Sequence, residues 1–185
     1  MWAIGLGAIL LTLPVMAQRV AGQKAADSRV EKAFLDAETR VHVRWSGQPE
    51  QVMERDHSAD QCDGDESHPC VEASASQLIV SADRRSVGWT AEYYECCQNY
   101  PIPFVLVIAR EGGIVQRIQV GLGIFDWGFV DGGRKVALFY DTAHSDLRPT
   151  CVLYDAQTWK QISTWYPGKS VVPPRWAKSF VKDMQ

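Results

Sequence analysis

The chain has 185 residues, a formal net charge of −3 and 46% hydrophobic residues. This length is sufficient for one domain with a sizeable core, and the hydrophobic fraction is typical of a globular chain. A mildly acidic chain without a basic cluster is a poor candidate for binding nucleic acid or an anionic membrane surface. The composition therefore indicates a single globular domain and argues against functions that depend on strong positive charge.

Residues 1–17 have the pattern of a secretory signal peptide. Residues 3–16 carry no charge and form a stretch shorter than the roughly 20 residues of a transmembrane helix. Val15 and Ala17 are small residues at the −3 and −1 positions of a cleavage site, so we predict cleavage after Ala17. No Lys or Arg precedes the apolar stretch, and a membrane anchor or a buried N-terminal strand is the alternative. We expect a periplasmic or secreted chain, 18–185, without a membrane span.

The mature chain is predicted to begin with a helix over residues 27–40. Ser28 and Glu31 have the spacing of a capping box, in which each side chain bonds a free backbone N–H of the first turn. Apolar residues then recur at the spacing of one helix face, at Val30, Ala33, Phe34 and Ala37. Residues 41–45 alternate between apolar and polar, which predicts a strand.

Residues 47–76 form an acidic region with little periodicity, which predicts a long surface loop. Loops of this length are usually functional or tied down. The weak metal-ligand candidates in it are His57, Asp60 and His68, but no standard zinc or calcium spacing is present. We prefer a disulfide between Cys62 and Cys70 that closes the loop, and we expect no metal and no cofactor.

Two stretches, 77–120 and 124–165, are each predicted to contain four strands. Both have the order strand, tight turn, strand, longer loop, strand, turn, strand, at an offset of about 46–49 residues. A period of about 40–50 residues with four strands is typical of propeller blades. We predict a mainly β fold, in which two four-stranded antiparallel blade-like units pack as one domain with the N-terminal helix, followed by a tail over residues 166–185.

The repeated turns also resemble known blades. Ser81-Ala-Asp-Arg-Arg85, Val130-Asp-Gly-Gly-Arg134 and Leu153-Tyr-Asp-Ala-Gln-Thr-Trp-Lys160 are similar to the turns of WD40-like and TolB-type β-propellers. Ala82 stands where those families have Pro, and Trp159 where they have Gly. The stretch from Gly88 to Phe104 resembles a group of uncharacterised exported bacterial proteins, which implies no activity. Two blades do not close a propeller.

The five cysteines all follow the signal peptide, where an oxidising compartment favours disulfides. One cysteine of an odd number stays unpaired. Cys96 and Cys97 are adjacent and point to opposite faces if they lie on a strand, so Cys151 is a natural partner for one of them. The predicted disulfide-forming residues are Cys62, Cys70, Cys96, Cys97 and Cys151.

No catalytic constellation is evident. His144 lies near Asp141 and Ser145, but the chain lacks a Gly-x-Ser-x-Gly elbow, and nothing places His144 beside a thiol. Trp89 and Trp127 are predicted to be core residues. Three tyrosines near one loop are candidates for an exposed surface that stacks on a sugar or docks a protein: Tyr93, Tyr94 and Tyr100.

We therefore expect a non-catalytic exported binding or scaffold module, with an unknown protein or glycan partner in the cell envelope. Its contact surface is predicted to comprise the two cysteine-containing loops, Asp56–Cys70 and Tyr93–Pro103. The alternatives are a small hydrolase or metal-dependent enzyme that uses the acidic loop and His144, and a self-associating structural protein of the envelope.

Overall fold

The computed structural model describes residues 28–59, 70–94, 100–120, 123–141, 149–168 and 172–180. The predicted signal peptide and its cleavage site lie outside these residues. Within them, the chain is mainly β and has only two short 3-10 helices, η1 (Asp131–Gly133) and η2 (Arg175–Ala177). The strands are β1 (Val30–Leu35), β2 (Val41–Trp45), β3 (Glu50–Val52), β4 (Ser74–Val80), β5 (Val87–Tyr93), β6 (Ile102–Arg110), β7 (Gly113–Gln119), β8 (Gly123–Val130), β9 (Lys135–Asp141), β10 (Thr150–Asp155) and β11 (Gln161–Trp165).

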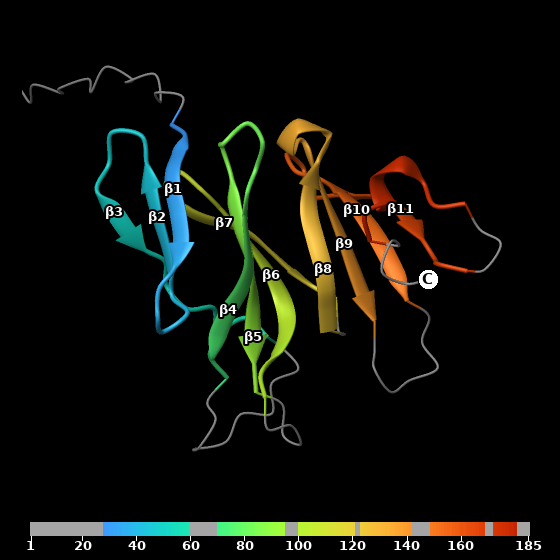
Figure 1. The fold of residues 1–185 in the computed structure, drawn as a ribbon, viewed down its shortest axis with the longest axis horizontal. Coiled ribbons are helices and arrows are strands. Elements are labelled where there is room, and N and C mark those ends of the chain that lie inside the picture. Colours follow the sequence, from blue (N-terminus) through green and yellow to red (C-terminus); the bar gives the residue numbers. More distant parts are fainter. Residues whose placement is uncertain are drawn as a thin grey trace, which may run out of the picture.

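The strands form three antiparallel sheets, and in each sheet the neighbours in space are also neighbours in sequence. The first sheet contains β1–β3, the middle sheet β4–β7 and the third sheet β8–β11. The three sheets follow one another along the long axis of the molecule (Figure 1). No helix in the described part of the chain is long and apolar enough to cross a membrane.

The predicted N-terminal helix over residues 27–40 is wrong, because its central residues form β1 and the next ones form the turn to β2. The helical spacing has a structural cause. A bulge between Val30 and Lys32 shifts the register against β2, so Val30 and Ala33, three residues apart, both contribute to the core. Phe34 instead stacks on His42, with ring centroids 4.8 Å apart. Glu31 forms an ion pair with Arg44 at 3.1 Å.

The prediction of two four-stranded units is also incomplete, because the first sheet is a third antiparallel unit. The strand predicted at residues 41–45 is confirmed as β2, and the strands predicted from residue 78 onward overlap β4 to β11. The tight turn predicted at Asp131–Gly133 is η1, with Gly132 and Gly133 at φ values of 68° and 93°.

The middle sheet is covered on both faces. From Val105 onward, β6 side chains alternate between two cores: Val105, Val107 and Ala109 pack with the first sheet, whereas Leu106 and Ile108 pack with the third. Phe104 also belongs to the first of these cores. The predicted core residues Trp89 and Trp127 are buried, and Trp45 is buried as well. A third core lies on the other side of the third sheet, where Ala177 and Phe180 of the tail pack on Ala137, Phe139 and Leu153.

Gly88 allows the middle and third sheets to pack closely. A Cβ atom at this position would lie 2.5 Å from Ile108 Cδ1 and 2.6 Å from Trp127 Cη2. Gly128 on β8 has no atom within 4 Å of the equivalent point.

We predict that Gly88→Ala lowers the free energy of unfolding by about 1–3 kcal/mol through overpacking. Gly128→Ala, the matched control, changes it by less than about 0.5 kcal/mol or stabilises the strand slightly. Urea denaturation checks both, and equal effects would contradict the packing argument.

Candidate functional site: two loops with one buried anchor

A fully buried carboxylate lies at the base of the long loop between the first and middle sheets. Asp56 is 0% exposed. Its Oδ2 accepts hydrogen bonds from the backbone N–H of Ser58 at 3.1 Å, from the Ser58 hydroxyl at 2.6 Å and from the Tyr93 hydroxyl. Its Oδ1 accepts a hydrogen bond from Nε of Arg117, which also forms an ion pair with it. We call Asp56, Ser58, Glu72, Tyr93 and Arg117 the loop anchor.

The loop anchor joins both ends of the first loop to the start of the second. The backbone N–H of Asp56 donates to Glu72 Oε2, and the N–H of Glu72 donates to the carbonyl of Asp56, both at 2.8 Å. Tyr93 is the last residue of β5, directly before the second loop, and Arg117 reaches Asp56 from β7. The two loops predicted to form a contact surface therefore leave the middle sheet from one place, at the end where β4 begins and β5 ends (Figure 1).

The electrostatics of the anchor keep Asp56 ionised and Tyr93 neutral. Burial raises the pKa of Asp56, but the hydrogen bonds from Ser58, Tyr93 and Arg117 outweigh it, and the pKa falls below its ordinary value. Burial, together with the neighbouring Asp56, raises the pKa of Tyr93. Burial also raises the pKa of Glu72. The carboxylate of Asp56 thus has hydrogen-bond donors on both oxygens, and the neutral phenol of Tyr93 is one of them.

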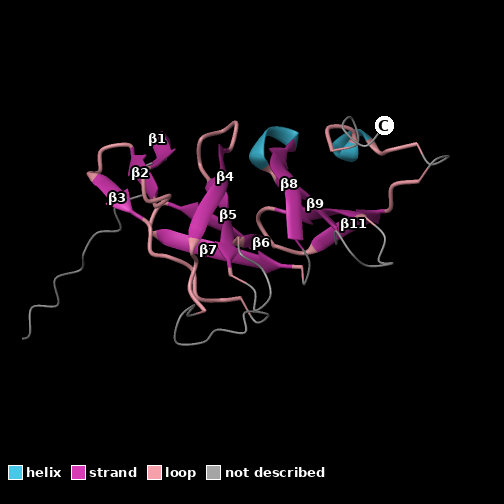
Figure 2. Ribbon diagram, turned by 60° about the horizontal axis from the view of Figure 1, so that its bottom comes forward, coloured by secondary structure: helices cyan, strands magenta, loops and turns pink. Residues whose placement is uncertain are grey.

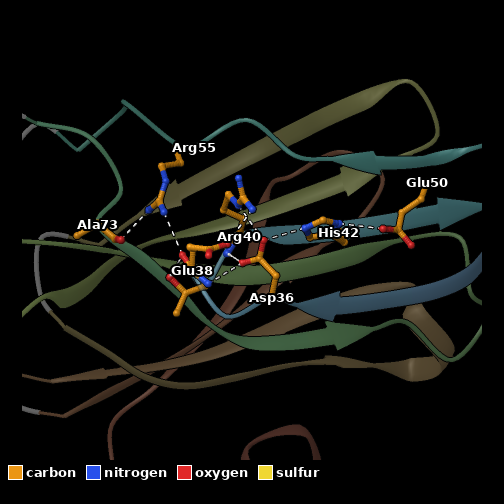
Figure 3. A network of polar contacts seen from close by, with 8 residues as sticks. Asp36, Glu38, Arg40, His42, Glu50, Arg55 and Ala73 are labelled. Carbon is orange, nitrogen blue, oxygen red and sulfur yellow. Dashed lines mark hydrogen bonds and ion pairs between the residues drawn. The ribbon is translucent and has the colours of Figure 1, made fainter.

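Arg55 connects the loop anchor to the turn between β1 and β2. Its Nη1 donates to the carbonyl oxygens of Glu72 and Ala73 at 2.8 and 2.6 Å, and its Nη2 donates to the carbonyl of Glu38 at 3.1 Å. Figure 3 shows this guanidinium between the two segments. The start of the first loop is thereby fixed to the first sheet as well as to the middle one.

Beyond Glu38, the contacts continue into a charged network on the outer face of the first sheet, around His42 (Figure 3). His42 Nε2 lies 3.0 Å from Asp36 Oδ2, and Nδ1 lies 2.9 Å from Glu50 Oε1. Arg40 Nε donates to the same Asp36 oxygen at 2.8 Å. Hydrogen bonds to Asp36 and Glu50 raise the pKa of His42, although partial burial opposes the shift. When the imidazole is protonated, both ring nitrogens donate to carboxylates, Nε2 to Asp36 and Nδ1 to Glu50.

The structure separates the predicted surface tyrosines. Tyr93 is fully buried in the loop anchor, so the prediction that it contributes to an exposed surface is wrong. Tyr94 and Tyr100, which flank the second loop on either side, are 36% and 59% exposed. The backbone alternation explains the difference, because Tyr93 and Tyr94 are consecutive residues at a strand end and point to opposite sides.

The cysteines and the metal candidates are only partly described. Most of these residues lie outside the described part of the chain: Cys62, Cys96, Cys97, Asp60, His68 and His144. His57 is described and is exposed. No disulfide is seen between residues that the structure describes. Cys151 is buried in β10 as a free thiol, and its predicted partners Cys96 and Cys97 lie outside the described residues. Burial, with a smaller effect of Asp126, raises its pKa to about 12, which makes it a poor nucleophile. Within the described ranges, no group of three metal-ligating side chains comes together.

Sequence reasoning missed the anchor itself. Asp56 and Arg117 are 61 residues apart and lie in a loop and a strand without a shared motif. The only signal was indirect: a long loop that contains cysteines is expected to be tied down.

The chain matches no family model and no curated protein.

The anchor predicts a specific loss of stability in Tyr93→Phe. The substitution keeps the ring but removes one donor from a fully buried carboxylate, and we expect the free energy of unfolding to fall by about 1–3 kcal/mol. Tyr154→Phe is the control, since Tyr154 is a half-buried tyrosine whose hydroxyl bonds no described residue. Denaturant unfolding measures both, and an equal small effect of the two substitutions would contradict the anchor.

The outer network predicts a pH dependence of stability. The pKa of His42 is raised above its ordinary 6.5, so its contribution is fully present below that value and is lost as the pH rises through the raised pKa. We expect the free energy of unfolding of the wild type to decline over this interval. His42→Gln removes that decline, whereas the exposed His57→Gln leaves it in place. A series of unfolding curves between about pH 5 and 9 tests this, and an unchanged slope in His42→Gln would refute it.

Proposed function

We propose that this chain is an exported, non-catalytic binding module whose contact surface is formed by the loops Asp56–Cys70 and Tyr93–Pro103. The loop anchor is the observation that carries the proposal. A buried, ionised carboxylate with donors from a loop and two strands is costly to desolvate, and its only described partners position the two loop bases. A rigid base below long polar loops is the usual arrangement of a binding surface on a scaffold.

The exposed tyrosines beside the second loop support the same assignment. Tyr100 is 59% exposed, and its ring offers a large apolar surface with a polar end. Such side chains contribute strongly to binding at protein interfaces and stack on sugars. We therefore propose a protein or a glycan of the cell envelope as the partner, in the periplasm or outside the cell.

We also propose that each of the three sheets is a propeller-blade-like unit. The first strands β1, β4 and β8 begin at Val30, Ser74 and Gly123, which is a repeat of about 44–49 residues. β1 contacts β4, and β4 contacts β8, as the inner strands of neighbouring blades do. This unit organisation agrees with the resemblance of the turns to WD40-like and TolB-type blades. It concerns the scaffold and implies no activity.

The alternative of a hydrolase or metal-dependent enzyme receives no support from the described geometry. Its residues are His57, Asp60, His68 and His144, and only His57 lies within the described part of the chain, where it is exposed. We therefore argue the binding function alone.

The binding proposal predicts that partner capture depends on Tyr100. The mature chain, immobilised and incubated at low salt with an extract of the cell envelope, is expected to retain a specific protein or glycan. Tyr100→Ala reduces the retained amount at least about tenfold, because removing a central aromatic side chain typically weakens an interface by this factor or more. Tyr166→Ala is the matched control, since Tyr166 is 54% exposed at the end of β11, away from the loops. No specific retention, or equal losses in both variants, would overturn the proposal.

A further inference from the structure

A pocket of about 560 Å³ lies between the β8–β9 turn and the C-terminal tail. Its walls come from the end of β8 and η1 on one side and from η2 on the other, and Figure 2 shows both 3-10 helices on the same side of the third sheet. The volume is in the range of small-molecule sites. No lining residue of this pocket belongs to the two loops, so its role is independent of the proposed binding surface.

The pocket exists because a short segment covers a wide sheet. The outer face of the third sheet carries apolar side chains that need a cover, and Ala177 and Phe180 provide it over Ala137 and Phe139. On the middle sheet, the corresponding face is covered by the whole third sheet. Among the described residues, a single helical turn with its flanking residues leaves the end of the third sheet near Asp131 uncovered, and this end forms the pocket.

Its lining combines an apolar wall with positive charge. Val130, Leu153 and the half-buried ring of Trp176 form the apolar part. Lys135 and Arg175 supply two cations. This combination suits a ligand that has an apolar, flat body and a negatively charged group.

The charges in the pocket are not balanced internally. The carboxylate of Asp131 forms ion pairs with Arg134 at 2.5 Å and with Lys135 at 3.1 Å, which lower its pKa and neutralise it. Arg175 makes no hydrogen bond or ion pair with any residue that the structure describes. Two cations, Lys135 and Arg175, thus line the pocket with one carboxylate, and Arg175 is the one of them with no described partner. A guanidinium in this position binds a carboxylate through two parallel hydrogen bonds.

We propose that this pocket binds a small aromatic carboxylate, with the ring against Trp176 and Leu153 and the carboxylate on Arg175 and Lys135. The carboxylate replaces water on Arg175 and competes with Asp131 for Lys135, while Arg134 keeps Asp131 neutralised. Both halves of the ligand contribute to binding. The ring buries apolar surface against the wall, and the carboxylate forms charge-assisted hydrogen bonds with the two cations.

The test uses 3-phenylpropionate as the probe, with 3-phenylpropanamide and propionate as the controls for charge and ring. Titrations follow the indole N–H resonance of Trp176 in 15N-labelled mature protein, assigned with Trp176→Phe. We expect 3-phenylpropionate to shift this resonance with a Kd on the order of 1 mM, given the size of the ligand. The amide and propionate are each expected to bind at least about tenfold more weakly, because each lacks one of the two interactions.

Two variants and one control locate the charge. Arg175→Gln and Lys135→Gln each raise the Kd for 3-phenylpropionate by about fivefold, a typical effect of one charge-assisted hydrogen bond on an exposed site. Lys160→Gln removes an exposed cation outside the pocket and leaves the Kd unchanged. The proposal is overturned if the amide binds as tightly as the acid, if neither pocket variant changes the Kd, or if the Trp176 resonance does not shift at about 10 mM probe.

Discussion

The middle sheet has apolar side chains on both faces, and the rest of the architecture follows from this constraint. Successive side chains of a strand point to opposite faces, and along β6 both sets are apolar and buried. Such a sheet cannot leave either face in water, so it needs a neighbour on each side. The first sheet supplies Val41, Val43 and Trp45 to one core, and the third sheet supplies Trp127, Val136 and Leu138 to the other. Gly88 sets how closely the third sheet approaches.

Within the described part of the chain, the outer faces of the two flanking sheets differ in character. The outer face of the first sheet is polar and charged, with His42 held between Asp36 and Glu50 and with Glu31 paired to Arg44. The outer face of the third sheet stays apolar and is covered by η2 and Phe180. The described residues therefore combine a sheet with a polar outer face and a sheet whose apolar outer face is covered by the C-terminal tail.

The part of the fold that could be predicted from the sequence is the part in which local pattern and tertiary role agree. From residue 78 onward, strand alternation and tight turns such as Asp131–Gly133 indicated β4 to β11. The helix predicted for residues 27–40 was wrong because the bulge after Val30 places two core residues, Val30 and Ala33, three positions apart, as on a helix face. The predicted helix also included the turn to β2, where Asp36 accepts the backbone N–H groups of Glu38 and Arg40. A single extra residue at a β-bulge is enough to interrupt the two-residue periodicity by which a strand is predicted.

The loop anchor could not be predicted for a different reason: its members share no local pattern, and only the packing of the sheets brings them together. Asp56 follows the first sheet, Tyr93 ends β5 and Arg117 lies in β7. The segment that carries Asp56 is also the connection between the first and middle sheets, and Arg55 within it bonds the turn of the first sheet and the backbone before β4. The same residues therefore join two sheets and fix two loop bases. The packing of the first sheet on the middle sheet and the position of the loop bases therefore depend on the same short segment of hydrogen-bonded residues.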